Sequence, residues 1–263
     1  MCQSVEEKVK QFYDSEGWVV DENGKTKEDY YFRDYGENHN SYKRNVGLKI
    51  ENSYFRSVDK NSLLIAGCGD LPESHLSLAK QFKDVTCADI SWRALDIARK
   101  KLDDKGDFRN ESIMQLSLPE NSFSAVLCAH VLYHIDKKNQ EKAVRELIRV
   151  TRSSGRIVFL YSNPNAPLML IQRFLKLLRI NKLLKKDKLY LFNHPLSWWM
   201  KFSDSCDIQF LPLEIVGTNQ ARALIPDKRF GKLFYPWAMN FEKKHPRSAT
   251  RLWSFIAVIL DKK

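Results

Sequence analysis

The chain has 263 residues, of which 43% are hydrophobic and 12% aromatic, so it can bury a substantial core and is not a disordered protein. It carries 43 lysines and arginines against 32 aspartates and glutamates, and this excess of 11 positive charges attracts anionic partners without identifying them. The five cysteines are odd in number and include no Cys-x-x-Cys pair, which argues against a disulfide framework or a zinc site and favours a reducing compartment.

Neither a signal peptide nor a membrane span is predicted. Residues 1–10 contain no apolar signal core, and no stretch reaches the roughly 18 uninterrupted apolar residues of a membrane span. We therefore expect a cytoplasmic protein.

The first sixty residues are rich in aromatic side chains. Apolar residues at helical spacing predict a short amphipathic helix over 4–13, and a second helix is expected over 40–56. Two interpretations stay open for this region: a helical layer packed on the edge of a sheet, or a lid over a ligand. In the second case Tyr13, Trp18 and Tyr31 are candidate wall residues.

From residue 62 onwards, short apolar runs alternate with helical patterns. Strands are predicted at 63–66, 85–88, 107–109, 125–128, 156–160, 207–216 and 253–260. Helices are predicted at 73–82, 92–102, 139–152 and 230–244. This alternation predicts an α/β fold: a Rossmann-like, doubly wound, mostly parallel seven-stranded sheet with N-terminal helices and an inserted helical cap. On this basis the chain divides into an N-terminal helical lid (1–60), a core (61–162 and 206–263) and an inserted, basic amphipathic cap (163–205).

The first strand leads directly into a glycine turn, Gly67-Cys68-Gly69. Glycines at the carboxyl end of a buried parallel strand let the chain turn tightly and let a ligand approach the backbone. Asp89 ends the second strand, where it can accept hydrogen bonds from a ribose diol. Pro72 stands where a dinucleotide fingerprint has its third glycine, and it lacks the N–H that would bind a pyrophosphate. The pattern therefore favours a nucleoside without phosphates over NAD or FAD.

Further short motifs follow the glycine turn. They are Asp89-Ile90-Ser91, Ala94-Leu95, Ala98-Arg99, Leu118-Pro119, Ser122-Phe123, His130-x-x-Tyr133-His134-Ile135, Glu146-Leu147, Arg149-Val150, Gly155 and Tyr161-Ser162. The N-terminal Val9-x-x-Phe12-Tyr13-Asp14 and Gly17-Trp18 precede them. In this order and spacing, over about residues 9–165, the chain resembles the class I S-adenosylmethionine-dependent methyltransferases, in particular their small-molecule branch with many bacterial members.

The resemblance implies S-adenosyl-L-methionine as the cofactor. In this family the glycine turn approaches the methionine part of the cofactor, the acid after the second strand holds the ribose hydroxyls, and an apolar neighbour covers the adenine. The residues implied to bind the cofactor are Gly67, Cys68, Gly69, Asp89, Ile90, Ser112, Ile113, Ala129, His130 and Tyr13. Ala66 and Ser124 stand where the family commonly has acids, and Asp70, Glu73 and Glu111 are candidates to compensate.

Two histidines follow the fourth strand, at the sheet edge toward which the transferred methyl group should point. Removing a proton from a hydroxyl acceptor needs a base, and histidine is suited to this near neutral pH. His134 and His130 are therefore the candidate catalytic residues, and the alternative is that either is a buried structural histidine. The candidate substrate contacts are Trp18, Tyr31, Tyr133 and His194, and no metal is expected.

The insertion combines apolar and basic residues at helical spacing. Residues 171–190 contain seven lysines and arginines but one aspartate, while Leu168, Ile171 and Phe174 recur at helical spacing. We expect a substrate cap first, with contact to a membrane or an anionic partner through residues 168–190 as the alternative. In that case the protein would be peripheral to the inner membrane surface.

These observations lead to one expected function and three alternatives. We expect transfer of a methyl group to a small molecule, at a hydroxyl oxygen of a sugar, lipid-linked or secondary-metabolite substrate. A non-catalytic or partner-binding relative is suggested by Ala66 and Ser124, and a nucleic-acid-binding methyltransferase by the positive charge. The latter is disfavoured because the lysines cluster in one insertion and no RNA-binding module is apparent. A nicotinamide oxidoreductase comes last, because the third glycine is missing.

Overall fold

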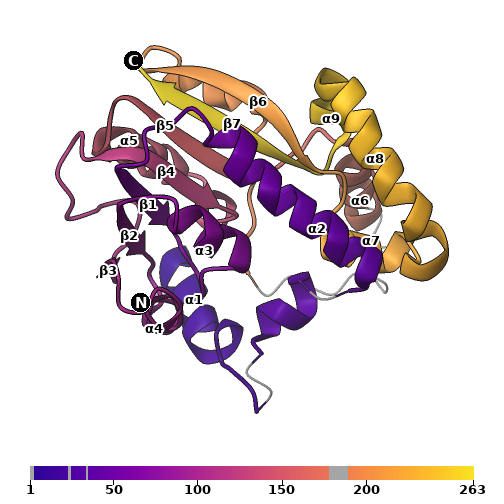
Figure 1. Ribbon diagram of the computed structural model, residues 1–263, viewed down its shortest axis with the longest axis horizontal. Coiled ribbons are helices and arrows are strands. Elements are labelled where there is room, and N and C mark those ends of the chain that lie inside the picture. The colour runs from indigo at the N-terminus through magenta and orange to yellow at the C-terminus, as the bar shows by residue number, and fades with distance from the viewer. Residues whose placement is uncertain (1–2, 23–24, 34, 178–188) are drawn as a thin grey trace.

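The computed structural model describes residues 3–22, 25–33, 35–177 and 189–263. Within them the strands form a seven-stranded sheet in the order β3-β2-β1-β4-β5-β7-β6 (Figure 1). The strands are β1 (Ser62–Ala66), β2 (Asp84–Ala88), β3 (Asp107–Arg109), β4 (Phe123–Ala129), β5 (Thr151–Ser162), β6 (Cys206–Glu214) and β7 (Phe255–Lys262). The first five strands pair in parallel, and β7 runs antiparallel to both β5 and β6. The predicted mostly parallel α/β sheet is confirmed.

Helices connect the parallel strands, as the alternating pattern predicted. Helices α3 (Glu73–Ala79) and α4 (Trp92–Lys101) follow β1 and β2, and α5 (Gln140–Val150) follows β4. The helix predicted over 139–152 ends at Val150, because Thr151 already has extended backbone and pairs with Phe123 of β4. The Thr151 hydroxyl caps the helix end by donating to the carbonyl of Leu147.

The N-terminal residues form helical elements outside the sheet. They are α1 (Val5–Phe12), η1 (Tyr13–Gly17), η2 (Asp29–Arg33), α2 (Glu37–Lys49) and η3 (Ile50–Tyr54). Ser4 and Glu7 form a capping box at the start of α1, so that two N–H groups of the helix end are satisfied. Figure 1 shows α2 crossing the front of the sheet. The helix predicted over 40–56 is this helix together with η3.

The core lies on both faces of the sheet because successive strand residues point in opposite directions. In β1, Leu63 and Ile65 belong to the core that includes Tyr42 of α2, whereas Leu64 belongs to the opposite core with Leu147 of α5. Each of these side chains is buried. The parallel strands are therefore covered on both sides, and their carboxyl ends meet at one edge.

The residues after β5 combine helices with the last two strands. The helical elements described there are α6 (Pro167–Leu177), η6 (Leu196–Phe202), α7 (Thr218–Leu224), η7 (Asp227–Gly231), α8 (Lys232–Lys244) and α9 (Pro246–Leu252). Helices α7 and α9 were not predicted. In the described residues, no helix is both long and apolar enough to cross a membrane. Residues 178–188 of the predicted basic cap lie outside the description, and the proposed division into lid, core and cap stays a prediction.

Candidate active site

The glycine turn after β1 is held in a backbone conformation that favours glycine. Gly67 and Gly69 have φ angles of 72° and 55°, in the left-handed region. A Cβ atom on Gly67 would lie 2.2 Å from Cγ2 of Val131, which follows β4. The Gly67 N–H donates to the carbonyl of Ala88 at 2.7 Å, so the turn is joined to the end of β2. The predicted tight turn between neighbouring strand ends is confirmed.

Asp89 connects the end of β2 to this turn. One of its carboxylate oxygens accepts from the N–H of Gly69 at 2.9 Å, and the other accepts from the N–H of Ser91 at 2.8 Å. Burial raises the pKa of Asp89 to about 6, against the opposing effect of these hydrogen bonds. The chain therefore presents a half-buried acceptor beside the glycine backbone, where the sequence predicted one.

The loop after β3 lies against the N-terminal helix. The hydroxyl of Ser112 donates to the carboxylate of Glu6 in α1 and accepts from the N–H of Met114 at 3.2 Å. Ile113 is buried, and Ile90 is half-buried at the end of β2. The side chain of Asn110 donates to the carbonyls of Asp89 and Ile90, each at 2.9 Å. These bonds hold the ends of β2 and β3 and helix α1 together.

Two aromatic residues cover the glycine turn. The rings of Tyr13 and Trp18 are stacked with centroids 5.3 Å apart, and Trp18 is buried. An atom placed as Cβ on Gly69 would lie 3.0 Å from the indole of Trp18, so the indole rests on the turn. Tyr13 also meets the ring of His134 edge to face at 6.3 Å. Burial raises the pKa of Tyr13 well above its ordinary value, with the negative charges of Glu28 and Asp89 adding to this effect.

His134 lies in a short helix, η4 (Leu132–His134), beside Tyr133. Its Nδ1 is 2.9 Å from the carbonyl oxygen of Tyr190, and its ring is 4.8 Å from that of Tyr133. A carbonyl accepts but does not donate, so Nδ1 carries the proton in this contact and Nε2 is the basic nitrogen. Residues 190–192 lie beside this short helix, because the N–H of Phe192 donates to the carbonyl of Tyr133.

His130 has a different environment from His134. It has a φ angle of 61°, and its N–H donates to the carbonyl of Leu160 at 3.0 Å. Its ring meets Phe255 of β7 edge to face at 5.5 Å, and burial lowers its pKa to about 4. His130 is therefore neutral and packed between β4 and β7. Ala129, the residue before it, pairs with Leu160 and is half-buried.

The remaining predicted residues are placed as follows. Cys68 is buried in the turn, and its Sγ lies 3.4 Å from the carbonyl of Gly69. The His194 N–H donates to the Tyr161 hydroxyl of β5 at 2.7 Å, and the ring stacks on Trp198 at 4.3 Å, so these contacts are not with Tyr13 or Trp18. The side chain of Tyr31 lies outside the described residues.

Three charged residues near the turn were not predicted as a group. Arg33 of η2 donates to both carboxylate oxygens of Asp70, at 2.6 and 2.5 Å, and Lys101 donates to the same carboxylate at 3.3 Å. Burial alone would raise the pKa of Asp70, but Arg33 and Lys101 hold it below the ordinary value. Asp70 is thus already neutralised by cations of the chain. Arg33 and Asp70 are 37 positions apart in the sequence, so no local pattern predicts the pair.

Glu28, just before η2, was also missed. Burial raises its pKa to about 7, although Arg33 opposes the shift. The negative charge of the same carboxylate contributes to the raised pKa values of Tyr13 and Tyr133. In the sequence it is one of many acids, so only its surroundings distinguish it.

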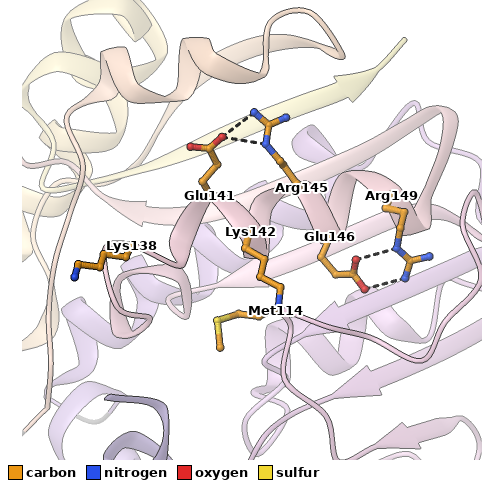
Figure 2. A pocket seen from close by; sticks show the side chains of 7 residues that line it. All are labelled: Met114, Lys138, Glu141, Lys142, Arg145, Glu146 and Arg149. Carbon is orange, nitrogen blue, oxygen red and sulfur yellow. Dashed lines mark hydrogen bonds and ion pairs between the residues drawn. The ribbon is translucent and has the colours of Figure 1, made fainter. Parts of the chain in front are cut away.

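A hollow of about 500 Å³ lies elsewhere, on the outer face of α5 (Figure 2). Figure 2 shows the two carboxylates in it bound to arginines, Glu141 to Arg145 and Glu146 to Arg149. Of the predicted site residues, none lines this hollow. It is therefore not the candidate active site. Nor do the described residues contain a group of three His, Cys, Asp or Glu that could hold a metal ion.

Comparison with known proteins agrees with this geometry. Residues 64–159, which run from β1 to β5, match the family model described as a methyltransferase domain. This segment is a methyltransferase domain, as the resemblance to the class I S-adenosylmethionine-dependent methyltransferases predicted. The matched segment includes the glycine turn, Asp89 and both candidate histidines. The resemblance predicted from the motifs is confirmed.

Among curated proteins, the methyltransferase domain is similar to ubiquinone/menaquinone biosynthesis C-methyltransferases named UbiE. The protein of Pseudomonas paraeruginosa is 33% identical over 137 residues, which are 50% of this chain and 52% of that protein. The protein of Yersinia enterocolitica is 35% identical over 107 residues, 38% of this chain and 42% of that protein. The chain thus spans about half the length of the curated relatives it matches.

Solved structures share the fold at low sequence identity. Magnesium protoporphyrin IX methyltransferase from Synechocystis, solved with bound S-adenosylmethionine, has a TM-score of 0.60 at 12% identity, covering 100% of this chain and 99% of that one. Geranyl diphosphate C-methyltransferase from Streptomyces coelicolor has a TM-score of 0.59 at 12% identity, covering 100% and 99%. The N-methyltransferase NodS from Bradyrhizobium japonicum has a TM-score of 0.56 at 12% identity, covering 84% and 87%.

S-adenosylmethionine is the cofactor of this family, and the residues at the turn fit it. Gly69 leaves the backbone open to a ligand on the side that Trp18 now covers, whereas Val131 packs against Gly67. Asp89 supplies a half-buried carboxylate, while Ile90 and Ile113 supply apolar contacts. A nucleoside with a cationic sulfur needs an acceptor for its diol and apolar surfaces for its base, and both are present.

Proposed function

We propose that the protein transfers a methyl group from S-adenosylmethionine to a small molecule, at a hydroxyl oxygen. A sugar, a lipid-linked compound or a secondary metabolite is the proposed acceptor class. The observation that carries the proposal is the placement of the glycine turn, Asp89 and His134 around the aromatic pair Tyr13 and Trp18.

The cofactor supplies a methyl group activated on a positively charged sulfur. Asp89 would accept from the ribose hydroxyls, and Ile90 and Ile113 would contact the adenine. The backbone of Gly67 and Gly69 would approach the methionine part. These assignments rest on the family together with the positions of these residues at the carboxyl edge of the sheet.

The aromatic rings of Tyr13 and Trp18 would exclude water from the site. Aromatic faces attract cations, so rings over the turn suit a sulfonium. Because the indole of Trp18 rests on Gly69, this segment must move when a cofactor enters. We therefore propose that the N-terminal residues act as a lid. They are anchored to the sheet edge by side-chain contacts that include Ser112 to Glu6, Ser91 to Asp14 and Arg33 to Asp70.

His134 is the proposed general base. Its Nδ1–H is oriented by the Tyr190 carbonyl, so Nε2 is the nitrogen that can take a proton from an acceptor hydroxyl. This arrangement is the reason for choosing an oxygen acceptor, although the UbiE relatives are named C-methyltransferases and NodS an N-methyltransferase. His130, which is neutral and packed on Phe255, is proposed as a wall residue. Tyr133 is proposed to contact the substrate.

The proposal is tested by transfer of a labelled methyl group from S-adenosylmethionine to panels of hydroxylated, amino and carbon acceptors. With the best acceptor, His134→Gln should lower kcat by about 100-fold while leaving the affinity for S-adenosylhomocysteine unchanged. His194→Gln is the matched control, because that histidine stacks on Trp198 away from the aromatic pair, and it should retain activity.

Three results would contradict the proposal. Failure to bind S-adenosylhomocysteine at millimolar concentration would reject the cofactor site. Full activity of His134→Gln would reject the base. Transfer to amines alone would reject the oxygen acceptor.

A further inference from the structure

Four large apolar side chains form a stripe along η7 and α8, and three of them are exposed. Phe230, Leu233, Phe234 and Trp237 are spaced by three and four residues, so they share one side of the helix. Leu233 is 73% exposed, Trp237 52% and Phe230 51%. We call these four residues the aromatic stripe.

The stripe is ordered, and one of its members, the half-buried Phe234, packs against the core. The rings of Phe230 and Phe234 are stacked at 5.4 Å, and those of Phe234 and Trp237 are 5.7 Å apart. Another side of the same helix is held to the protein by the buried Tyr235 and Ala238. Because Tyr235 and Ala238 face the protein, Leu233 and Trp237 face outward. A large exposed apolar patch of this kind marks an interaction surface.

The surroundings of the stripe are strongly basic. Residues 222–251 contain eight lysines and arginines but only two acids. Both acids are used internally: Asp227 accepts from the N–H of His39, and Glu242 binds Lys49 and the indole of Trp253.

The cations beside the stripe, in contrast, face solvent. Lys228, Arg229, Lys232, Lys243 and Lys244 are exposed. None of the five forms an ion pair with a carboxylate in the part of the chain that the structure describes. Exposed aromatic residues beside unpaired cations are typical of helices that lie at the surface of an anionic membrane.

Neighbouring helices extend this surface. Leu224 of α7 is exposed, and the side chain of Gln220 in α7 donates to Gln172 of α6 at 3.3 Å. Helix α6 presents Ile171 and Phe174 to solvent. Figure 1 shows α6, α7 and α8 gathered at the same end of the molecule. Exposed apolar residues thus occur on three helices at one end.

We propose that the aromatic stripe and its flanking cations dock the protein on an anionic lipid bilayer. The positive charge beside the stripe favours a bilayer over a second copy of the chain. A symmetric contact between two copies would bring two such basic faces together, and like charges repel at short range. A bilayer with anionic headgroups offers negative charge to the lysines and an apolar interior to the rings. The inference uses none of the residues proposed to bind cofactor or acceptor, so it stands independently of the proposed function.

Vesicle flotation of the full chain tests the proposal. At moderate salt the protein should float with vesicles of phosphatidylcholine containing about 30% phosphatidylglycerol, and much less with phosphatidylcholine alone. The double variant Leu233→Ser/Trp237→Ser should lower the bound fraction by roughly tenfold, because both side chains lose their insertion into the bilayer. Lys228→Gln/Lys232→Gln should weaken binding on the anionic vesicles only.

A matched control replaces exposed apolar residues elsewhere on the chain. Trp92 is 53% exposed and Val20 is 48% exposed, and Trp92→Ser/Val20→Ser should float like the wild type. Circular dichroism must show unchanged folding for every variant, and light scattering must give its oligomeric state. Equal binding to neutral vesicles would overturn the proposal, as would wild-type binding by Leu233→Ser/Trp237→Ser. A dimer that the same substitutions dissociate would overturn it in favour of a second copy.

Discussion

At the scale of single residues, Asp89 shows how local sequence and surroundings combine. Its position after β2 follows from the strand pattern, but its raised pKa follows from burial beside the backbone of Gly69. A carboxylate can accept from a ribose hydroxyl when it is ionised. A protonated carboxyl group loses part of that acceptor capacity. The affinity for cofactor should therefore depend on pH through this group.

We predict that S-adenosylhomocysteine binds about tenfold more weakly at pH 5 than at pH 7.5. Because the pKa of Asp89 is raised to about 6, roughly one protein molecule in ten has an ionised Asp89 carboxylate at pH 5. Titration calorimetry across this range measures the effect. Asp89→Asn should bind weakly at both pH values and lose the dependence. If this variant keeps the same pH profile, another group is responsible.

At the scale of elements, the N-terminal residues are attached to the sheet edge by paired charges. Arg33 of η2 binds Asp70 in the glycine turn, and the Asp70 side chain is 3% exposed while that of Arg33 is 30% exposed. Breaking a buried pair leaves an uncompensated charge, which costs far more than breaking a pair in solvent. Asp70 was considered as a partner for the cationic cofactor, but the contact with Arg33 and Lys101 gives it a structural role.

We predict that Arg33→Met lowers the free energy of unfolding by about 2–3 kcal/mol. Lys101 still contacts Asp70, and Arg33 is partly exposed, so the loss should fall below that of a fully buried pair. Urea denaturation measures it. Arg145→Met is the matched control: its pair with Glu141 is exposed on α5, at 56% and 37%, and its loss should cost less than about 1 kcal/mol. Equal losses in both variants would mean that burial of Asp70 has no effect.

At the scale of the whole molecule, the site joins distant parts of the chain. The Tyr35 hydroxyl donates to the carbonyl of Ile225 at 2.7 Å. The two ring nitrogens of His39 each lie 3.1 Å from a hydroxyl oxygen, Nδ1 from that of Tyr235 and Nε2 from that of Thr218. The N-terminal helices thus contact the sheet edge on one side and the C-terminal helices on the other. A ligand under the Tyr13–Trp18 pair should stabilise all of these contacts at once.

We predict that S-adenosylhomocysteine at about 100 times its Kd raises the melting temperature by roughly 5–10 °C. Binding at this ratio stabilises the folded state by about 2.7 kcal/mol, and a chain of this size gains a few degrees for each kcal/mol. Differential scanning calorimetry measures the shift. Asp89→Asn should show a much smaller shift at the same ligand concentration. An unchanged melting temperature of the wild-type protein, with binding detected by calorimetry, would contradict the prediction.

Much of the sheet could be predicted because each strand carries its own local signal. A short apolar run followed by glycine or aspartate marks β1 and β2, and the alternation with helices indicates a parallel sheet. Element ends were less predictable: α5 stops at Val150 because Thr151 pairs with β4, a contact between distant residues. Helices α7 and α9 have seven residues each and weak patterns, so they were missed.

The sequence by itself determined the α/β sheet, the glycine turn, the carboxylate at its side and the order of motifs that identifies the domain. These depend on residues close together in the chain, where spacing and residue type are sufficient. Only the tertiary structure decided that Asp70 pairs with Arg33 and that Trp18 covers Gly69. It also decided that His130 and His134 have different surroundings. Those facts depend on which distant side chains share a buried space, and burial and long-range pairing are set by packing of the whole chain.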